Sequence, residues 1–400
     1  MLRRAALIML LTLCVGGAVA QTNELYIVGS DTLSYQYRPI DQTSDTLMER
    51  GRPGRWLDRY LGGIPLGKEH NVKVSLVGGP AYSTETSLRL TLIGTMDYRT
   101  KHHTADTFPS TLKLSASASI TGYYHIAISG HNSLKNNRHR LFYRTEVTSL
   151  PTRIWGLDYD SSLHGRQGSY VSKLYTALFR YNYALVKGLY IGVSADYRYN
   201  AARKPDSDAI TILTGRDMTL STAGLGINIT YDSRDDISAP HRGIYLSIEG
   251  IARPAPLNNV GHNLWQATLT FDAYQPLWRG AVLAFDLYAE HHSAATPWLL
   301  RSQLGDEHRM RGYYAGRFNG NNLITTQLEL RQHIWYRIGC VLWGGVGTTF
   351  SEDDRFAWRK VLPNYGIGLR WALRERSNIR LDFGFGRDSF GVVVGINEAF

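Results

Sequence analysis

The chain has 400 residues, of which 43% are hydrophobic, and a formal net charge of +10. Its 25 Tyr, 9 Trp and 39 Gly are typical of many strands and tight turns, with aromatic side chains left for membrane interfaces. Only two cysteines occur, which excludes a disulfide-rich scaffold. The basic charge favours anionic lipid headgroups over nucleic acid, because no nucleic-acid motif accompanies it.

The first twenty residues have the pattern of a secretory signal peptide. Arg3-Arg4 precedes an apolar run that ends in Ala18-Val19-Ala20, which fits an A-x-A cleavage site. We therefore expect residues 1–20 to be removed. A membrane-anchoring helix is the alternative, but the run is short. A lipoprotein attached through Cys14 would need a better lipobox than the one present.

The next segment, residues 21–70, is polar and irregular. It contains the breaker Gly51-Arg52-Pro53-Gly54. Fifty residues are too few for an ordinary domain with its own core. We expect a short periplasmic N-terminal segment that caps or plugs the mouth of the domain that follows, residues 71–400.

From residue 72 onward, apolar and polar residues alternate with the period of two that β-strands require. In 189–198 and 379–385, for example, one face is apolar and the other carries charges beside Gly or Ser. A soluble β-sandwich would also alternate. The charged faces and the stretch lengths of about 9–12 residues instead favour a transmembrane antiparallel β-barrel with a wet interior.

Sixteen strands are predicted, an even number as in bacterial barrels. Their expected spans are 71–78, 86–97, 110–121, 123–130, 139–148, 170–183, 188–198, 219–231, 243–251, 263–275, 280–291, 322–333, 337–349, 362–373, 378–385 and 391–397. The division of 110–130 into two strands has the weakest support.

Short and long connections alternate along these strands. Lys187-Gly188 and Arg279-Gly280 are short, whereas 149–169, 199–218 and 292–321 are long. Outer-membrane barrels have short periplasmic turns and longer outer loops. The pattern therefore predicts a bacterial outer-membrane protein with both ends of the barrel in the periplasm.

Three segments resemble the BamA superfamily of outer-membrane assembly and translocation barrels, also called bacterial surface antigen barrels. The first is similar to the family's RGF/RGY loop and the second to its Y-D-T-R-D…P…G-x-Y segment. The third is similar to its last strand, which ends in an aromatic residue. These three segments are, in the same order, Met310–Phe318, Tyr231–Glu249 and Gly391–Phe400.

The resemblance implies a sixteen-strand barrel whose sixth outer loop folds back into the lumen. It implies that Arg311 reaches a charged side chain of the inner wall, for which Glu329 is the candidate because it lies on a polar strand face. A guanidinium offers five donors and suits such a pair. The other residues that match the family motifs are Gly312, Tyr313, Gly316, Arg317, Asp232, Arg234, Asp235, Gly243, Gly395 and Phe400.

The chain departs from the family pattern at two places. Gly345 stands where the family commonly has the Asp that pairs with the loop arginine. Residues 21–70 are too short for a periplasmic POTRA domain, so the resemblance is to a POTRA-less branch. At the C-terminus, Phe400 fits an assembly signal and equally an interface aromatic at the periplasmic belt, although Glu398 stands where an apolar residue is usual.

No catalytic or metal-binding motif is present, so we expect no enzyme, no cofactor and no metal. His102-His103 and His291-His292 are adjacent pairs, whose side chains point to opposite faces of a strand. The pairs Asp235-Asp236 and Asp353-Asp354 are expected to be solvated loop charges. Ser389 has no histidine near it in sequence.

The expected function is to aid assembly, insertion or translocation of outer-membrane or surface proteins. A weak seam between strands 71–78 and 391–397 would open to template an incoming strand. The implied partners are outer-membrane lipid and lipopolysaccharide, client outer-membrane proteins and accessory lipoproteins. The alternatives are a lipid-export component, a displayed adhesin or hydrolase, or a passive channel lined by cations. The candidate cations are Lys73, Arg89, Arg198 and Arg380.

Overall fold

The structure is a computed structural model that describes residues 64–66, 72–83, 86–98, 110–134, 138–237, 239–374 and 377–400. The expected signal peptide, 1–20, and nearly all of 21–70 lie outside these residues. In the described part of the chain, no helix is long and apolar enough to cross a membrane.

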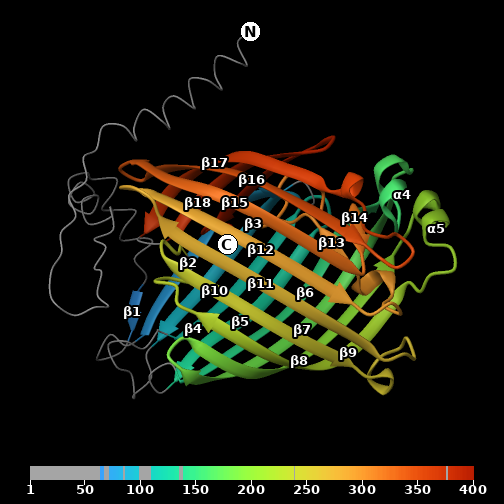
Figure 1. The fold of residues 1–400 in the computed structure, drawn as a ribbon, viewed down its shortest axis with the longest axis horizontal. Helices are drawn as coiled ribbons and strands as arrows, with labels where there is room; N and C mark the ends of the chain where they lie inside the picture. Colours follow the sequence, from blue (N-terminus) through green and yellow to red (C-terminus); the bar gives the residue numbers. More distant parts are fainter. Residues whose placement is uncertain are drawn as a thin grey trace, which may run out of the picture.

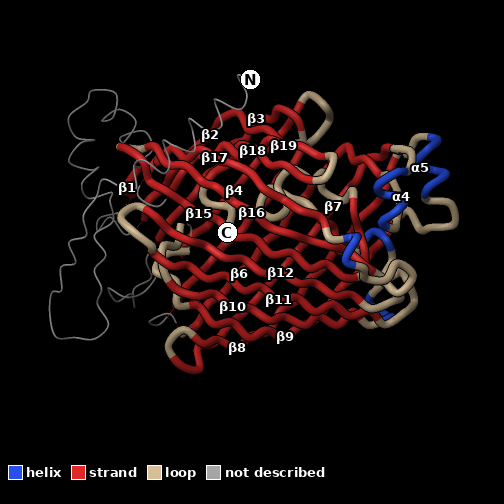
Figure 2. Tube along the Cα trace, turned by 45° about the horizontal axis from the view of Figure 1, so that its top comes forward, coloured by secondary structure: helices blue, strands red, loops and turns tan. Residues whose placement is uncertain are grey.

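Sixteen strands form one antiparallel barrel, so the predicted fold class and strand number are confirmed (Figures 1 and 2). Each strand pairs with the next along the chain except at the junction of the last with the first. The strands are β2 (Val72–Ser83), β3 (Ser87–Tyr98), β4 (Ser110–Ser119), β5 (Tyr124–Leu134), β6 (His139–Ile154), β7 (Gly168–Val186), β8 (Leu189–Arg203), β9 (Thr219–Asp232), β10 (Gly243–Arg253), β11 (Leu264–Pro276), β12 (Ala281–His292), β15 (Asn322–Trp335), β16 (Ile338–Phe350), β17 (Leu362–Arg374), β18 (Ser377–Gly386) and β19 (Ser389–Ile396).

The predicted strand boundaries needed correction mainly where strands run farther than expected. β6 runs six residues past the expected end at 148, to Ile154, because its pairing with β7 continues to Gly168. The doubtful division of 110–130 is correct: a turn after Ser119 separates β4 from β5. The alternation alone does not show where a membrane strand leaves the bilayer.

The longest connections, after β6, β8 and β12, lie at one end of the barrel, at the right in Figure 1, and the connections at this end carry short elements that the sequence did not predict. The α-helices are α4 (Tyr159–His164) and α5 (Ser207–Ile212), the 3-10 helices are Ala255–Leu257, Trp298–Leu300 and Trp358–Lys360, and the short strands are β13 (Ser302–Leu304) and β14 (Phe318–Gly320). Each α-helix begins at an aspartate that accepts a backbone N–H, a standard N-cap.

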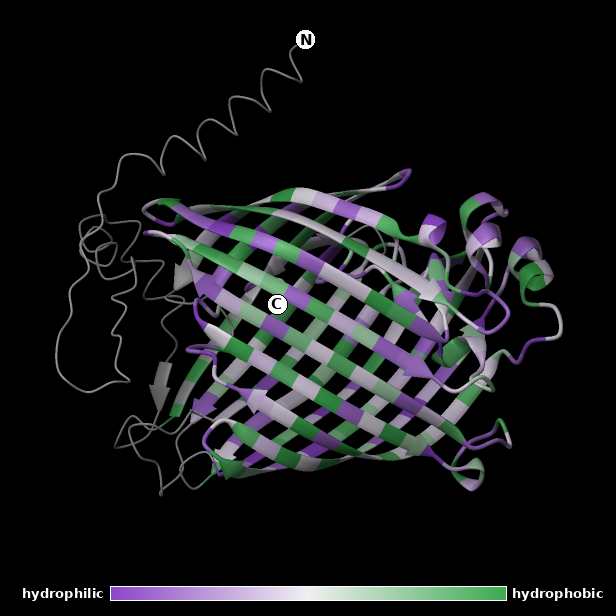
Figure 3. Ribbon diagram, viewed as in Figure 1, coloured by the Kyte–Doolittle hydropathy of each residue, from purple (hydrophilic) through white to green (hydrophobic). Residues whose placement is uncertain are grey.

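The two faces of the barrel wall have opposite chemistry, which Figure 3 shows as alternating bands along the strands. On β15, Leu328 is 46% exposed and Glu329 is fully buried. On β9, Ile227 is 71% exposed whereas Asn228 is buried. The apolar side chains therefore face outward, where lipid would cover them, and the polar side chains fill the interior.

The barrel is nearly closed, and its seam lies between β19 and β2. β19 and β2 are neighbours in the one sheet, but among the described residues they contact each other far less extensively than the other neighbouring barrel strands do. A short strand before the barrel, β1 (Ile64–Leu66), pairs with Val72–Val74 of β2. Because β3 takes one edge of β2, β1 must occupy part of the other edge, which faces the seam.

Candidate functional site

The connection between β12 and β15 folds against the inner wall of the barrel. Its apolar side chains are buried in one cluster with wall residues and with a tyrosine of α4. The buried members from the connection are Leu304, Met310, Tyr313 and Phe318, and their partners are Leu323, Leu362 and Tyr159. Burial of this apolar surface fixes the loop in place and brings its arginines to the polar wall.

Arg311 is fully buried and bonds two carboxylates from strands that are three apart in the wall. Its Nη2 lies 2.6 Å from the Glu329 Oε2 on β15, the partner proposed from sequence. Its Nη1 lies 2.8 Å from the Asp382 Oδ2 on β18. The second partner was missed because alternation identifies Asp382 as inward-facing but does not say which residue it meets.

The wall supplies two further contacts to Arg311. The guanidinium carbon lies 3.7 Å from the ring centroid of Trp343, a cation–π contact. The Asn364 amide donates to the backbone carbonyl of Arg311 and its Oδ1 accepts from the Trp343 indole. Gly345 stands next to Gln327 on the inner face of the wall, and Asp382 provides the carboxylate that this glycine lacks.

The two ion pairs of Arg311 belong to a larger buried network that reaches the C-terminal residues. Glu329 also accepts from Arg331 at 2.8 Å, and Asp382 accepts from Arg370 at 2.5 Å. Arg370 in turn donates to Glu398 at 2.8 Å. Alternating positive and negative groups compensate one another, which a low-dielectric site requires for buried charge.

Glycines on the inner wall provide the space for the loop backbone. Gly312 has φ +114°, and a Cβ there would lie 2.6 Å from the carbonyl carbon of Gly384. The Tyr313 ring occupies the space above Gly386, and its hydroxyl donates to the Pro363 carbonyl at 2.7 Å. Side chains at these wall positions would push the loop away.

The end of the motif turns toward the outer connections. Arg317 Nε donates to the Ser162 carbonyl at 3.1 Å, and its guanidinium lies above the Trp155 ring at 5.4 Å. The Gly316 N–H donates to the Leu304 carbonyl at 3.4 Å. Arg311 and Arg317 therefore differ in role, since Arg317 contacts neutral carbonyls of α4.

Two more charged residues of the loop, missed from sequence, contact the wall. The Arg309 Nη2 lies 2.6 Å from the Asp286 carboxylate of β12. The Glu307 carboxylate lies 2.6 Å from Arg89 of β3. Arg89 lies on β3, next to the first barrel strand, and Asp382 lies on β18, next to the last. The loop therefore makes ion pairs on both sides of the seam.

The motif between β9 and β10 builds a turn at the opposite end from the helices. Asp232 pairs with Arg234 at 3.0 Å and with Arg140 of β6 at 3.3 Å. Asp235 accepts two backbone N–H groups of the turn at 3.0 and 3.1 Å. Gly243 has φ +110°, and a Cβ there would lie 2.4 Å from a backbone oxygen. These residues are brought to one turn, whose Pro240 carbonyl accepts from Arg331 of the buried network at 3.4 Å.

The C-terminal residues enter the barrel instead of ending at its rim. The Phe400 ring packs 6.3 Å from that of Tyr274, and its carbonyl accepts from Arg331 at 2.8 Å. Gly395 leaves room for the Arg380 side chain, since a Cβ there would lie 3.0 Å from its Nε. The expected place of Phe400 at the periplasmic belt therefore differs from the structure, because polar partners of 397–400 line the interior.

The described residues hold no group of three or more His, Cys, Asp and Glu side chains that could bind a metal ion. His291 bonds Asn322 whereas His292 contacts Glu290, so the pair diverges as its strand position requires. The Ser389 hydroxyl donates to the Gly312 carbonyl at 2.5 Å. That bond ties the last strand to the loop.

The sequence pattern of the Omp85 superfamily domain matches residues 66–394. The chain belongs to the Omp85 superfamily. The resemblance to BamA-type barrels inferred from the three segments is thereby confirmed, and the protein is an outer-membrane β-barrel of this superfamily. No protein of curated function matches the chain by sequence.

Solved structures with the same fold include BamA from Haemophilus ducreyi lacking POTRA domains 1–3, at TM-score 0.55 and 14% identity over 81% of this chain and 70% of that one. CdiB from Acinetobacter baumannii (TM-score 0.54, 14% identity, 82% and 60%) and CdiB from Escherichia coli (0.54, 14%, 83% and 63%) are similar. The chain spans less than two thirds of both CdiB structures. At this identity the likeness concerns the fold.

Proposed function

We propose that this Omp85 barrel aids the insertion or translocation of outer-membrane or surface proteins and performs no chemical reaction itself. The observation that carries the proposal is the seam between β19 and β2, where the described strands contact each other far less extensively than the other neighbouring barrel strands do. An unpaired strand edge exposes N–H and C=O groups that can template an incoming strand. Membership of the superfamily supports the same conclusion.

The composition of the last strand supports a weak seam. β19 has eight residues and contains Gly391 and Gly395, so it has few side chains to hold a neighbour. β1 pairs with only three residues of the seam edge of β2. An incoming strand would therefore compete with β1 at one end of this edge and with β19 along the rest.

The loop centred on Arg311 is proposed as a brace that must loosen before the seam opens. Glu307 bonds Arg89 on one side of the seam, and Arg311 bonds Asp382 on the other. The His308 ring also contacts the Ala399 carbonyl at 2.7 Å. Opening would separate these partners, so the brace sets the free-energy cost of opening.

The passive-channel alternative is less well supported by the same contacts. A selective conduit needs accessible charges, yet Arg89 is paired with Glu307 and Arg380 lies buried 3.5 Å from Asp382. The side chain of Lys73 lies outside the described residues. A lumen occupied by the loop and residues 397–400 favours low conductance, which bilayer recordings would detect.

Orientation and partners complete the proposal. The short turns and both ends of the barrel are assigned to the periplasm, and α4 and α5 to the cell surface, because outer loops are the longer ones in such barrels. Lipid and lipopolysaccharide surround the apolar outer face. Client outer-membrane proteins are the proposed substrates, with accessory lipoproteins as further partners.

Quantitative mass spectrometry of the outer membrane after depletion of this protein tests the proposal. We expect several unrelated barrels or surface proteins to fall together, and a wild-type copy to restore them. An unchanged outer-membrane proteome would overturn the assembly role. A loss confined to outer-leaflet lipid would instead favour the lipid-export alternative.

A further inference from the structure

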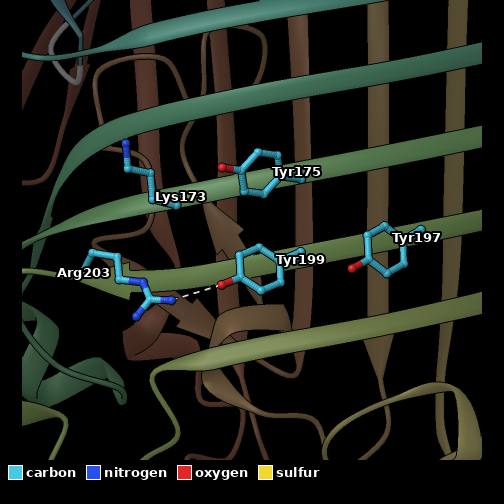
Figure 4. A pocket seen from close by; sticks show the side chains of 5 residues that line it. All are labelled: Lys173, Tyr175, Tyr197, Tyr199 and Arg203. Atoms are coloured by element: carbon cyan, nitrogen blue, oxygen red, sulfur yellow. Dashed lines mark hydrogen bonds between the residues drawn. The ribbon is translucent and has the colours of Figure 1, made fainter.

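The outer surface of the β7–β8 hairpin carries a groove that the proposed assembly mechanism does not use (Figure 4). Its volume is about 470 Å³. The side chains that line it are Lys173, Tyr175, Tyr197, Tyr199 and Arg203. Two come from β7 and three from β8, whose register places Tyr175 opposite Tyr199.

The groove opens on the face that meets lipid. Tyr175 is 41% exposed and Tyr197 is 43% exposed. Farther along the same face of the hairpin, Phe179 and Val193 are also exposed. Side chains alternate along a strand, so the groove and these apolar residues share the outward face.

The position of the groove along the strands corresponds to a membrane boundary. A tilted membrane strand needs about 9–11 residues to cross the apolar layer. Val186 is the last residue of β7 before the short turn to β8, and counting eleven residues back from it reaches Thr176. Lys173 lies beyond that point, toward the end that carries α4 and α5. The cations of the groove are therefore at headgroup level, and Tyr175 is at the edge of the apolar layer.

Both cations are held by hydroxyl groups. The Lys173 Nζ donates to the Tyr124 hydroxyl at 2.8 Å, and the Arg203 Nη2 donates to the Tyr199 hydroxyl at 3.1 Å. Among the described residues, neither cation forms an ion pair with a carboxylate. The groove thus presents two uncompensated positive charges beside phenolic hydroxyls.

A simple aromatic belt explains part of this surface. Tyrosines are common at the membrane interfaces of barrels, and Tyr175 packs 5.5 Å from Tyr199 as cross-strand aromatics do. A belt does not require a hollow between the rings or two cations that lack carboxylates. These two features indicate a ligand with negative charge.

We propose that the groove binds the phosphorylated headgroup of an outer-leaflet glycolipid of the lipid A type. A phosphate accepts hydrogen bonds from an ammonium and from a guanidinium, and such charge-assisted bonds are the strong ones. The acyl chains would lie along Phe179 and Val193. The assignment to the outer leaflet rests on the orientation given under the proposed function.

Native mass spectrometry of the full folded chain in detergent tests the site. The probes are diphosphoryl lipid A, its dephosphorylated form, phosphatidylglycerol and inorganic phosphate. We expect one retained diphosphoryl lipid A, and binding weaker by about tenfold or more when Lys173→Gln and Arg203→Gln are combined. The matched control is Lys187→Gln, an exposed cation at the other end of the same hairpin, which should bind as the wild type does.

Each other outcome overturns the proposal. Equal binding of the dephosphorylated form removes the phosphate from recognition, and equal binding of phosphatidylglycerol makes the surface a general anionic-lipid site. Displacement by millimolar inorganic phosphate makes it a free-anion site. An equal loss in Lys187→Gln makes the effect one of net charge.

Orientation is tested separately, so its failure can be told apart from failure of the site or of the assembly role. Ile210 on α5 is 53% exposed, and Ile210→Cys should react with a membrane-impermeant maleimide on intact cells. Labelling supports the outer-leaflet assignment. Labelling only after the outer membrane is broken overturns that assignment, whereas the outer-membrane proteome after depletion reports on assembly.

Discussion

Arg311 holds two carboxylates that come from different parts of the wall. Replacing it with alanine would leave Glu329 and Asp382 buried without their shared counter-ion. Loss of one partner from a buried ion pair costs about 3–5 kcal/mol, so we expect Arg311→Ala to lower the free energy of unfolding by that order. Urea titration of the folded barrel in detergent, followed by tryptophan fluorescence, measures it.

Arg317→Ala is the matched control for that experiment. Arg317 donates to neutral carbonyls of α4, so Arg317→Ala leaves no buried carboxylate without a counter-ion, and the expected loss is smaller, about 1.5–3 kcal/mol. An equal loss of stability in both variants would contradict the special role of Arg311.

The backbone of Gly312 lies directly on Gly384 of β18. In Gly312→Ala the new Cβ would meet a backbone atom at 2.6 Å and the residue would keep a φ of +114°. We expect the loop to lift from the wall and become sensitive to trypsin within 306–317. Gly215→Ala is the control, because Gly215 also has a positive φ, of +72°, but has open space around it. Equal trypsin sensitivity of the two variants within 306–317 would contradict the role of the Gly312–Gly384 contact, because both variants share the backbone strain of a positive φ.

At the scale of elements, α5 is expected to respond to acid through its N-cap. Hydrogen bonds from the Ala209 N–H and the Ser169 hydroxyl hold the pKa of Asp206 below its ordinary value. The cap therefore stabilises α5 at neutral pH and loses this effect as the pH falls below about 4. A lower protection factor of 207–213 against hydrogen exchange at low pH would show it, and Asp206→Asn should remove this pH dependence. A protection factor of this segment that stays constant across that pH range in the wild type would contradict the assignment.

The loop brace is a second element whose effect is local. Glu307→Gln removes the charge that bonds Arg89 and leaves the pair of Arg311 with Asp382 intact. We expect faster hydrogen exchange in β2 and β19, which flank the seam, and unchanged exchange in β7 and β8. Uniform exchange across all four strands would argue that the loop does not brace the seam.

The elements also show what sequence can and cannot predict. Alternation identified the strands and placed Glu329 and Asp382 on the inner face, because period two is local information. It could not bring Asp382 to Arg311, since that contact depends on how far apart the strands are around the barrel. The inward course of Phe400 and the contacts of Arg309 depend on long-range charge pairing, for which the sequence has no periodic signal.

At the scale of the whole molecule, fifteen pairs of neighbouring barrel strands are joined by antiparallel ladders, three of them with a β-bulge or irregularity, and the described strands β19 and β2 contact each other much less extensively than any of these pairs. The proposed function depends on this weaker seam. If the barrel works by opening between β19 and β2, then a covalent bond across the seam must stop it while the fold remains.

The design uses outward-facing positions on the two strands, with Cys340→Ala removing the buried native thiol. A small panel of pairs covers the possible registers across the seam, each combining one position of β2 with one of β19. The positions are Leu76 and Gly78 on β2 and Phe390 and Val392 on β19, each changed to Cys. The control pair is Leu92→Cys with Ala116→Cys, which face each other across a closed ladder.

The decisive measurement is recovery of the outer-membrane proteome in depleted cells that carry a seam-locked variant, with and without a reductant. We predict no recovery while the disulfide is formed, full recovery after reduction, and full recovery at all times for the control pair. Recovery with the seam still locked would contradict the account, and the function would then have to be sought elsewhere in the barrel.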